Sequence, residues 1–315
     1  MVEQCWRRHL RGGEEYGDAQ VPEMRAHSRR VSRLQRRAAE HGYLPYVQQH
    51  RSSVSRARST LEVGTRTGAR VASGREGSEL GVAVVTGGSR GLGAALCAEY
   101  RARGWSVIEF SRTGTETFSA HLDLSDPLEA AEVFSEAFVS LAELEIPEIV
   151  VISNAGMVEP IGPVENTTPK AIASHIDVNV TSAILVARAF VSVFQGHDCP
   201  KTFVNISSGA AAQGYAGWSL YCASKAALEN FVQSMALEQS ARDHPIRAIS
   251  VNPGVMDTAM QATVRASSVR DFPAVERYVR LKADGMLQAP SAVASRIADL
   301  VASRPQAGRV YSASG

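Results

Sequence analysis

The chain has 315 residues, 44% of them hydrophobic, and a formal net charge of +1 at pH 7. This composition provides enough apolar surface for a sizeable core in one large domain or two small ones, which excludes a wholly unstructured chain. The charge is unevenly placed. Residues 1–79 contain 15 arginines and 9 acidic residues, whereas residues 80–315 contain 18 basic and 23 acidic residues.

The cysteines and the hydropathy pattern exclude further classes of protein. Cys5, Cys97, Cys199 and Cys222 are scattered, without a CxxC pair or a histidine at metal-ligand spacing, so we expect no disulfide framework and no metal site. The sequence shows no run of about 18 apolar residues and no apolar secretory segment near residue 1. We therefore expect a cytoplasmic protein without a membrane partner.

Residues 1–79 are rich in Arg, Ser, Gly and Gln and hold few apolar residues. We expect this N-terminal extension to lack a stable fold, apart from a short basic helix between residues 25 and 42. Its arginines favour either a solvated tail or a contact with the phosphates of nucleic acid or acidic lipid. Because no nucleic-acid-binding motif accompanies them, we expect a solvated tail and no nucleic-acid partner.

From residue 80 onward, short runs rich in Val and Ile alternate with segments of helical length. Continuous apolar runs of this kind predict buried strands of a parallel sheet, with crossover helices on both faces. We therefore expect a doubly wound α/β domain of the Rossmann type over residues 80–315. Its predicted strands lie at residues 81–86, 106–110, 148–153, 201–207 and 246–252.

Two predicted helices also bear on assembly. The segment TSAILVARAFVSVF (181–194) is apolar on nearly every face, which predicts burial on more than one side. One side would lie on the sheet, and the other would face either a partner subunit or the interior of a thick single-domain core. Ala223, Ala226 and Ala227 would allow close helix packing. We expect a homo-oligomer, either a dimer or a tetramer.

The first predicted strand is followed by the glycine-rich segment TGGSRGLG (86–93) and then by a predicted helix. In this context the backbone N–H groups of the turn and the helix N-terminus bind a diphosphate. Gly91 and Gly93 lack Cβ atoms and so allow a cofactor and a neighbouring strand to approach closely. Thr86 and Ser89 can bond the turn and a phosphate. The segment predicts a dinucleotide site.

The spacing TGxxxGxG resembles that of the short-chain dehydrogenase/reductase family, and other landmarks of that family follow in order: HLDLSD, Asn-Ala-Gly, DVNV, NISSG, YCASK and VNPG. The resemblance covers about residues 80–315 and implies a Rossmann fold, a nicotinamide cofactor and oxidoreductase activity. The residues that it places in the cofactor site are Gly87, Ser89, Arg90, Gly91, Leu92, Gly93, Arg112, Asp123, Leu124, Asn154, Ala155, Gly156, Tyr221, Lys225, Pro253, Gly254, Met256 and Thr258.

The end of the second predicted strand favours NADP(H) over NAD(H). NAD-dependent dinucleotide folds carry a carboxylate there for the ribose hydroxyls, whereas this strand ends in Phe110-Ser111-Arg112. Arg112 and Arg90 would place two guanidinium groups at the 2′-phosphate, whose oxygens match the arginine fork. Glu109, on the same side of the strand as Ser111, argues in the opposite direction.

Carbonyl reduction requires a proton donor and a group that holds the oxygen as its negative charge develops. Tyr221 is the predicted acid, and Lys225, one helical turn away, would lower the pKa of the phenol. By the resemblance, Lys225 also binds the nicotinamide ribose. Ser208 would bond the substrate carbonyl, and Asn179 resembles the family residue that holds a water and completes a proton relay to the lysine.

Residues 208–287 resemble one branch of the family, the sepiapterin reductases and bacterial benzil reductases, which reduce one carbonyl of a vicinal diketone. Aromatic and methionine side chains would form an adaptable apolar wall for a flat molecule. The resemblance places Ser312 where sepiapterin reductases carry an aspartate that anchors the pterin, so we favour a diketone over a pterin. The residues expected to contact the substrate are Ser208, Trp218, Tyr221, Met256 and Met260.

Two other functions stay open on the sequence alone. The enzyme could act on another ketone, such as a 3-oxoacyl thioester or a hydroxysteroid. Alternatively, the chain could be a non-catalytic NADP(H) sensor whose basic extension binds nucleic acid. A sensor needs no positioned proton donor, so the presence of Ser208, Tyr221 and Lys225 argues against it. We predict an NADPH-dependent carbonyl reductase that acts on a vicinal diketone, with Tyr221 as general acid.

Overall fold

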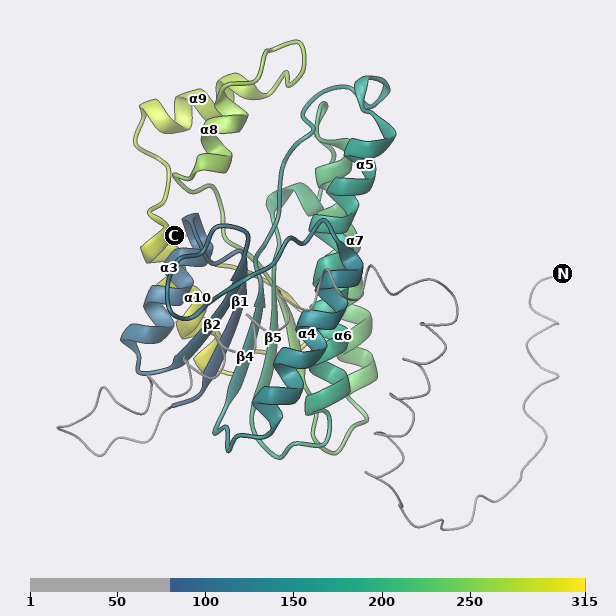
Figure 1. Ribbon diagram of the computed structural model, residues 1–315. Coiled ribbons are helices and arrows are strands. Elements are labelled where there is room, and N and C mark those ends of the chain that lie inside the picture. Colours follow the sequence, from purple (N-terminus) through teal and green to yellow (C-terminus); the bar gives the residue numbers. More distant parts are fainter. Residues whose placement is uncertain (1–79, 315) are drawn as a thin grey trace, which may run out of the picture. The chain divides into compact units, whose positions relative to one another are not determined.

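The computed structural model describes residues 80–314 (Figure 1). These residues form a seven-stranded sheet in the order β3-β2-β1-β4-β5-β6-β7, and all neighbouring strands are parallel. The predicted doubly wound α/β class is therefore confirmed. The predictions for residues 1–79 lie outside the described residues.

The central strands match the apolar runs from which strands were predicted, and the two edge strands do not. Each edge strand has three residues and at most one buried side chain, so neither leaves an apolar run in the sequence. The strands are β1 (Val82–Thr86), β2 (Ser106–Ser111), β3 (Ser119–His121), β4 (Ile149–Ser153), β5 (Lys201–Ile206), β6 (Arg247–Asn252) and β7 (Val310–Ser312).

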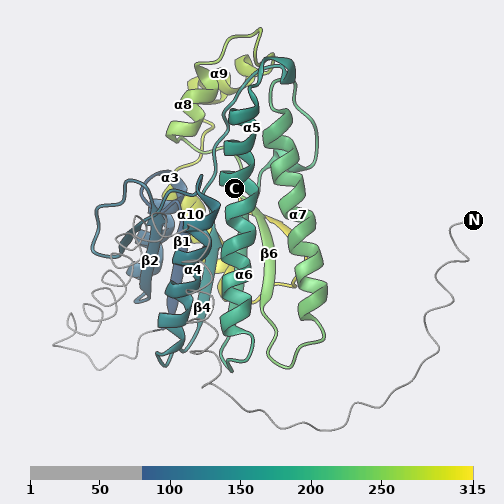
Figure 2. The same cartoon turned by 45° about the vertical axis from the view of Figure 1, so that its right-hand side comes forward.

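Helices cover both faces of the sheet. On one face α3 and α10 contact each other, and on the other face α4, α6 and α7 lie side by side (Figure 2). The short helices α8 and α9 follow β6 and lie beyond its carboxyl end (Figure 2). The helices are α3 (Gly91–Ala102), α4 (Pro127–Ala142), α5 (Pro169–Ile176), α6 (Ser182–Phe194), α7 (Ser219–Gln239), α8 (Ala259–Arg265), α9 (Val275–Ala283) and α10 (Pro290–Ala302).

Strand β1 shows why the central strands are continuous apolar runs. Val82 and Val84 belong to the core shared with α4 and α6, whereas Ala83 and Val85 belong to the core shared with α3 and α10. A strand that is buried on both faces has no polar side, so its sequence does not alternate. The strand order reverses between β1 and β4, and in such sheets this point opens a crevice at the carboxyl ends of the strands.

One helical segment, Pro169–Phe194, is long and apolar enough to cross a membrane by length and composition alone. It consists of α5 and α6, joined by the π-helical turn Asp177–Thr181. Phe190 and Phe194 are buried and contact Phe138 of α4 with ring centres 5.5 and 6.1 Å away. In the described domain one face of α6 therefore packs into the core.

The helix faces that bear on assembly are partly exposed. Arg188 and Ser192 are exposed on α6, as are Ala223, Ala226 and Ala227 on α7. The core of a single domain therefore covers α6 on one side only. The expected homo-oligomer stays a prediction.

Candidate functional site

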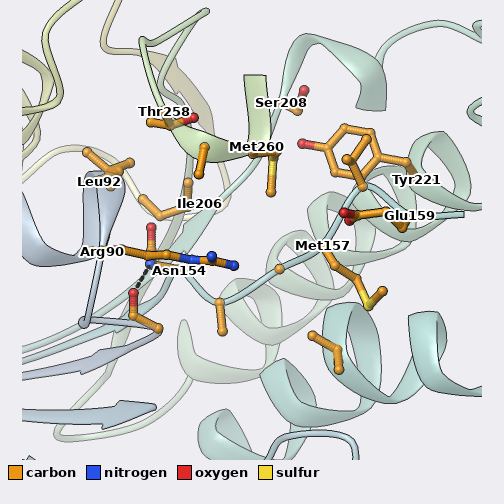
Figure 3. Close-up of a pocket in the computed structure, with 18 of the residues that line it drawn as sticks. Arg90, Leu92, Asn154, Met157, Glu159, Ile206, Ser208, Tyr221, Thr258 and Met260 are labelled. Atoms are coloured by element: carbon orange, nitrogen blue, oxygen red, sulfur yellow. Dashed lines mark hydrogen bonds between the residues drawn. The ribbon is translucent and has the colours of Figure 1, made fainter. Parts of the chain in front are cut away.

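A cavity of about 530 Å³ opens at the carboxyl ends of the central strands (Figure 3). Its volume is typical of small-molecule sites, which enclose about 300–1,000 Å³. Every residue that was predicted to bind the cofactor or to contact the substrate lines this cavity. Asn179, Thr86 and Ser312, for which the sequence also suggested a place in the site, lie outside the lining.

The turn between β1 and α3 requires glycine. Gly91 has a φ of +57°, which side-chain-bearing residues rarely adopt, and a Cβ atom on Gly93 would lie 2.0 Å from the carbonyl oxygen of Gly87. Without side chains at these points, the backbone of the turn and the N-terminus of α3 face the cavity. This geometry suits a diphosphate.

Side chains beneath this turn connect β1 to the end of β4. Thr86 Oγ1 accepts hydrogen bonds from the backbone N–H groups of Asn154 and Ala155, each at 3.1 Å. Asn154 Nδ2 donates to the carbonyl oxygens of Thr86 at 3.0 Å and Gly87 at 3.1 Å. Thr86 is 2% exposed, so the phosphate contact expected of its hydroxyl is wrong. Ser89, in contrast, lines the cavity and accepts a hydrogen bond from Thr113 at 3.1 Å.

The end of the cavity beside the glycine turn is positively charged. Arg90 and Arg112 line it, and both are exposed. Arg112 Nη1 lies 3.9 Å from Asp123 Oδ2, a long surface ion pair that contributes little and leaves most of the guanidinium donors available. The guanidinium groups of Arg90 and Arg112 therefore remain available at the place where the sequence predicts a 2′-phosphate.

Glu109 does not take part in the cavity. Its carboxylate is buried beneath the glycine turn, close to Gly88, and accepts a hydrogen bond from Ser111 Oγ at 3.1 Å. Burial raises the pKa of Glu109. The Glu109 side chain lies under the turn and outside the cavity lining, so it is not placed to bind the ribose hydroxyls. Glu109 therefore gives no reason to favour NAD(H).

Ser208, Tyr221 and Lys225 line the same cavity, with Ser208 and Tyr221 shown in Figure 3. Ser208 follows β5, and the other two lie on successive turns of α7. Lys225 Nζ donates a hydrogen bond to the Ile206 carbonyl at 2.8 Å and lies 5.8 Å from the centre of the Tyr221 ring. The structure thus brings the predicted acid, its lysine and the carbonyl-binding serine into one cavity.

Burial dominates the pKa values of Tyr221 and Lys225. It raises the pKa of Tyr221, and a hydrogen bond with Ser208 acts in the opposite direction. It lowers the pKa of Lys225 to about 8, opposed by the charge of Glu229. The lowered phenol pKa that we expected is therefore not found. The physical reason is that Tyr221 is only 8% exposed, while the lysine hydrogen-bonds a backbone carbonyl.

Asn179 lies behind the cavity, in the π-helical turn between α5 and α6. π-Turns of this kind are frequent at functional sites. Its side chain is buried and bonds the backbone of Met157 twice, Oδ1 accepting from the N–H and Nδ2 donating to the carbonyl, both at 2.8 Å. A Cβ atom on Gly156 would lie 3.5 Å from Asn179 Oδ1 and 3.7 Å from Lys225 Nζ. Asn179 is therefore close to the lysine, with its amide occupied by the backbone.

We call the part of the cavity around Ser208, Trp218 and Tyr221 the substrate end, because the predicted substrate contacts lie there. Aromatic rings form one of its walls. Trp218 stacks on Phe272 with ring centres 4.4 Å apart and meets Tyr221 edge-on at 5.4 Å. Met256 and Met260 line the cavity with Trp218, as predicted. The wall is therefore aromatic and apolar.

The lining residues that sequence reasoning missed include Val158, Glu159 and Tyr278. Val158 and Glu159 come soon after the Asn-Ala-Gly landmark, and their place after a strand end was a usable signal. Tyr278 lies on α9, and no local pattern connects that helix with the tyrosine on α7.

Ser312 lies elsewhere. It ends β7, pairs with Asn252 of β6 and bonds the hydroxyl of Ser314, outside the cavity lining. The resemblance implied a position for Ser312 beside the substrate, which this structure does not show. Ser312 therefore gives no reason to favour a diketone over a pterin. Within residues 80–314, no group of three His, Cys, Asp or Glu side chains is arranged to hold a metal ion.

Proteins with similar sequences include benzil reductases and sepiapterin reductases. Residues 81–268 match the family model described as short chain dehydrogenase. Benzil reductase ((S)-benzoin forming) of Bacillus subtilis is 36% identical over 233 residues, which cover 72% of this chain and 96% of that protein. Sepiapterin reductase of Mus musculus is 32% identical over 236 residues, covering 67% of this chain and 88% of that protein.

Solved structures with the same fold include the KRED1-Pglu enzyme, with a TM-score of 0.61, 28% identity, and coverage of 73% of this chain and 99% of that chain. A Beutenbergia cavernae protein, named for NAD(P)-dependent gluconate 5-dehydrogenase activity, has a TM-score of 0.62 and 25% identity, and covers 74% of this chain and 94% of its own. That structure contains NADP at low occupancy.

Proposed function

Because the chain belongs to the short chain dehydrogenase family and is an oxidoreductase, we propose that it uses NADPH to reduce a ketone, with vicinal diketones as its substrate class. The observation that carries the proposal is a single cavity with Arg90 and Arg112 and, in the same lining, Ser208, Tyr221 and Lys225. A carbonyl reductase needs both a cofactor site and a proton donor in one enclosure.

The cofactor end suits a dinucleotide that carries a 2′-phosphate. The side-chain-free glycine turn accommodates the diphosphate, and the guanidinium groups of Arg90 and Arg112 match phosphate oxygens. Glu109 is turned away beneath the turn. The NADP found in the Beutenbergia cavernae structure supports this choice of cofactor.

When bound, NADPH supplies a hydride for the ketone carbon. Tyr221 donates its hydroxyl proton to the ketone oxygen as negative charge develops there. The raised pKa of Tyr221 keeps the phenol protonated near neutral pH, which is the form required of an acid. Ser208, which lines the cavity near the Tyr221 hydroxyl, is placed to donate to the same oxygen and so to hold the carbonyl in line (Figure 3).

Lys225 stabilises the phenolate that Tyr221 forms when it gives up its proton. After the proton has left, the phenolate is negatively charged in a buried place, where a nearby cation is worth most. Because the pKa of Lys225 is lowered only to about 8, the side chain is still mainly an ammonium at pH 7. Its distance of 5.8 Å from the ring lets it act through space.

The wall of the substrate end favours flat molecules. Trp218, Tyr278 and Met260 present aromatic and methionine surfaces, which pack against planar aromatic groups. The name of one relative points the same way, since benzil reductase is named for benzil, an aromatic vicinal diketone.

The test is NADPH oxidation by the purified full chain, followed by absorbance. The panel contains benzil, 1-phenyl-1,2-propanedione, sepiapterin, an acetoacetyl thioester and a hydroxysteroid ketone, each repeated with NADH. Turnover of the diketones with NADPH is expected. Turnover of the thioester or steroid alone would move the enzyme to another ketone class. Tight NADPH binding without any turnover would support the sensor and contradict the proposal.

A further inference from the structure

A buried histidine lies directly behind the substrate end. His175, in the last turn of α5, has no exposed surface and no place in the cavity lining. Its Nδ1 lies 2.7 Å from the carbonyl oxygen of Glu159, and its Nε2 lies 3.0 Å from Asn179 Nδ2 and 3.4 Å from Ser224 Oγ. One imidazole thus connects the loop after β4, the π-helical turn and helix α7.

The partners determine which ring nitrogen carries the proton. A backbone carbonyl can only accept, so the short contact to Glu159 requires a proton on Nδ1. Ser224 Oγ donates its own proton to the Tyr221 carbonyl at 2.9 Å. Asn179 Nδ2 gives one proton to the Met157 carbonyl, and its second lies within reach of His175 Nε2 at 3.0 Å and of Ser224 Oγ at 3.3 Å. The shorter contact to Nε2 favours an unprotonated Nε2.

The Asn179 amide has no alternative orientation. Its Oδ1 accepts from the Met157 N–H at 2.8 Å. In a flipped amide, Nδ2 would face the Met157 N–H and Oδ1 would face the Met157 carbonyl, so neither hydrogen bond could form. A second proton on His175 would face the Asn179 donor across 3.0 Å, which costs the hydrogen bond. The hydrogen bond from Asn179 to His175 therefore forms only when the imidazole is neutral.

We propose that His175 is a positioning residue of the reductase, which in its neutral Nδ1–H form holds Asn179 and the Met157–Glu159 loop against the substrate end. The inference rests on the proposed ketone reduction. Met157 and Glu159 line the cavity, and Asn179 stands beside Gly156 and Lys225. A displaced loop would move the ketone, and a displaced Asn179 would disturb the surroundings of the lysine.

The charges around His175 favour the neutral ring. The pKa of His175 is lowered, and burial is the largest cause. The carbonyls of Glu159 and Leu220 raise this pKa, the charge of Lys225 lowers it, and the Glu159 carboxylate raises it. Asp177, at the end of the same helix, accepts a hydrogen bond from Thr181. Positioning is therefore present above this lowered pKa, and is lost as the pH falls through it.

Three substitutions separate the two contacts of the ring. His175→Gln keeps an acceptor for Asn179 and loses the donor to Glu159, His175→Asn keeps the donor and loses the acceptor, and His175→Leu loses both. The matched control is Val186→Ala, which opens a cavity in the core beneath α6, away from the site.

The measurements are kcat, KM and thermal stability on the ketone that the wild type reduces. We expect H175L to lower kcat by about 10-fold to 100-fold, with KM for NADPH unchanged. H175Q restores kcat and raises KM for the ketone, whereas H175N keeps KM and has a low kcat. The acid limb of the wild-type kcat profile is absent from H175Q. The control V186A loses thermal stability alone.

Two outcomes would overturn the inference. One is an H175L enzyme that behaves like V186A, and the other is a ¹⁵N NMR spectrum of the free wild-type protein at pH 7 that shows His175 as the Nε2–H or charged form. The NMR measurement needs no substrate. If the wild type reduces no ketone of the panel, the proposed function fails, while the spectrum still decides the histidine network.

Discussion

The two ends of the cavity are formed by different parts of the chain, one mainly by backbone groups and the other by side chains. The cofactor end is made mostly of backbone, in a glycine turn that Thr86 and Asn154 attach to β4. The substrate end is made of side chains from distant segments, such as Val158 after β4, Trp218 before α7 and Tyr278 on α9. A backbone site depends on local chain geometry, whereas a side-chain wall depends on how whole segments pack.

This difference teaches which changes each end tolerates. A side chain added to the glycine turn collides with backbone, which cannot move without disturbing the strands. A side chain changed in the aromatic wall alters the shape of a surface that the sheet does not need. We therefore expect cofactor binding to be sensitive to single atoms, and substrate choice to vary with little effect on the fold.

Tyr221→Phe should have the largest effect, because it removes the chemistry and leaves both ends in place. Loss of the general acid should lower kcat by about 10²- to 10⁴-fold, while the Kd for NADPH, measured by fluorescence titration, stays close to that of the wild type. Tyr311→Phe, which removes a hydroxyl bonded to the Gln306 carbonyl far from the cavity, is the control. Equal losses of turnover and NADPH binding in Y221F would argue that the phenol is structural.

Gly93→Ala should break the cofactor end. The added Cβ would lie 2.0 Å from the Gly87 carbonyl oxygen and 2.6 Å from Asn154 Nδ2, so the turn has to shift. We expect NADPH binding to weaken at least about tenfold and the unfolding free energy to fall by about 1–3 kcal/mol. Gly196→Ala, with nothing within 4 Å of the new atom, should change neither. Unimpaired NADPH affinity in G93A would exclude the turn as the diphosphate site.

The pH dependence should come next in size. Burial lowers the pKa of Lys225 to about 8, and the lysine supports Tyr221 only as an ammonium. Its charge is present below that pKa and is lost above it, so kcat for ketone reduction should fall as the pH rises through about 8, by roughly tenfold per pH unit. A rate profile at saturating NADPH and ketone measures this. A reduction rate that stays level up to pH 10 would mean that the lysine charge is not needed.

Arg90→Ala and Arg112→Ala should sharpen the picture of the cofactor end. Each removes a charge-assisted contact to a 2′-phosphate, so KM for NADPH should rise about tenfold while KM for NADH stays constant. Arg188→Ala, at an exposed position on α6, serves as the charge control. A parallel rise for both cofactors would place the arginines at the diphosphate or the ribose instead.

Met260→Ala should have the smallest effect, confined to the substrate end. Loss of part of the apolar wall should cost about 1 kcal/mol of binding, a severalfold increase in KM for an aromatic diketone, with KM for NADPH unchanged. The control is Met286→Ala, because Met286 is 66% exposed and outside the lining. If M260A changed the NADPH constants as well, the separation of the two ends would be wrong.

The predicted and the missed residues divide along the same line. The glycine turn, the Asn-Ala-Gly corner and the pair Tyr221 and Lys225 were predictable, since each is a short motif beside a strand or within one helical turn. Val158, Glu159 and Tyr278 were not, because they come together only after Tyr278 of α9 has packed against Trp218. The edge strands β3 and β7 escaped prediction for a related reason, since three residues with little burial leave no hydrophobic pattern.

By itself the sequence determined the class of fold and predicted the residues that we propose for cofactor binding and proton transfer, because buried strands, glycine turns and i, i+4 pairs leave local patterns. Only the tertiary structure decided that Glu109 points beneath the turn, that burial raises rather than lowers the pKa of Tyr221, and that His175 contacts Asn179. Burial and hydrogen bonding join residues far apart in the chain, and these long-range contacts exist only in the folded domain.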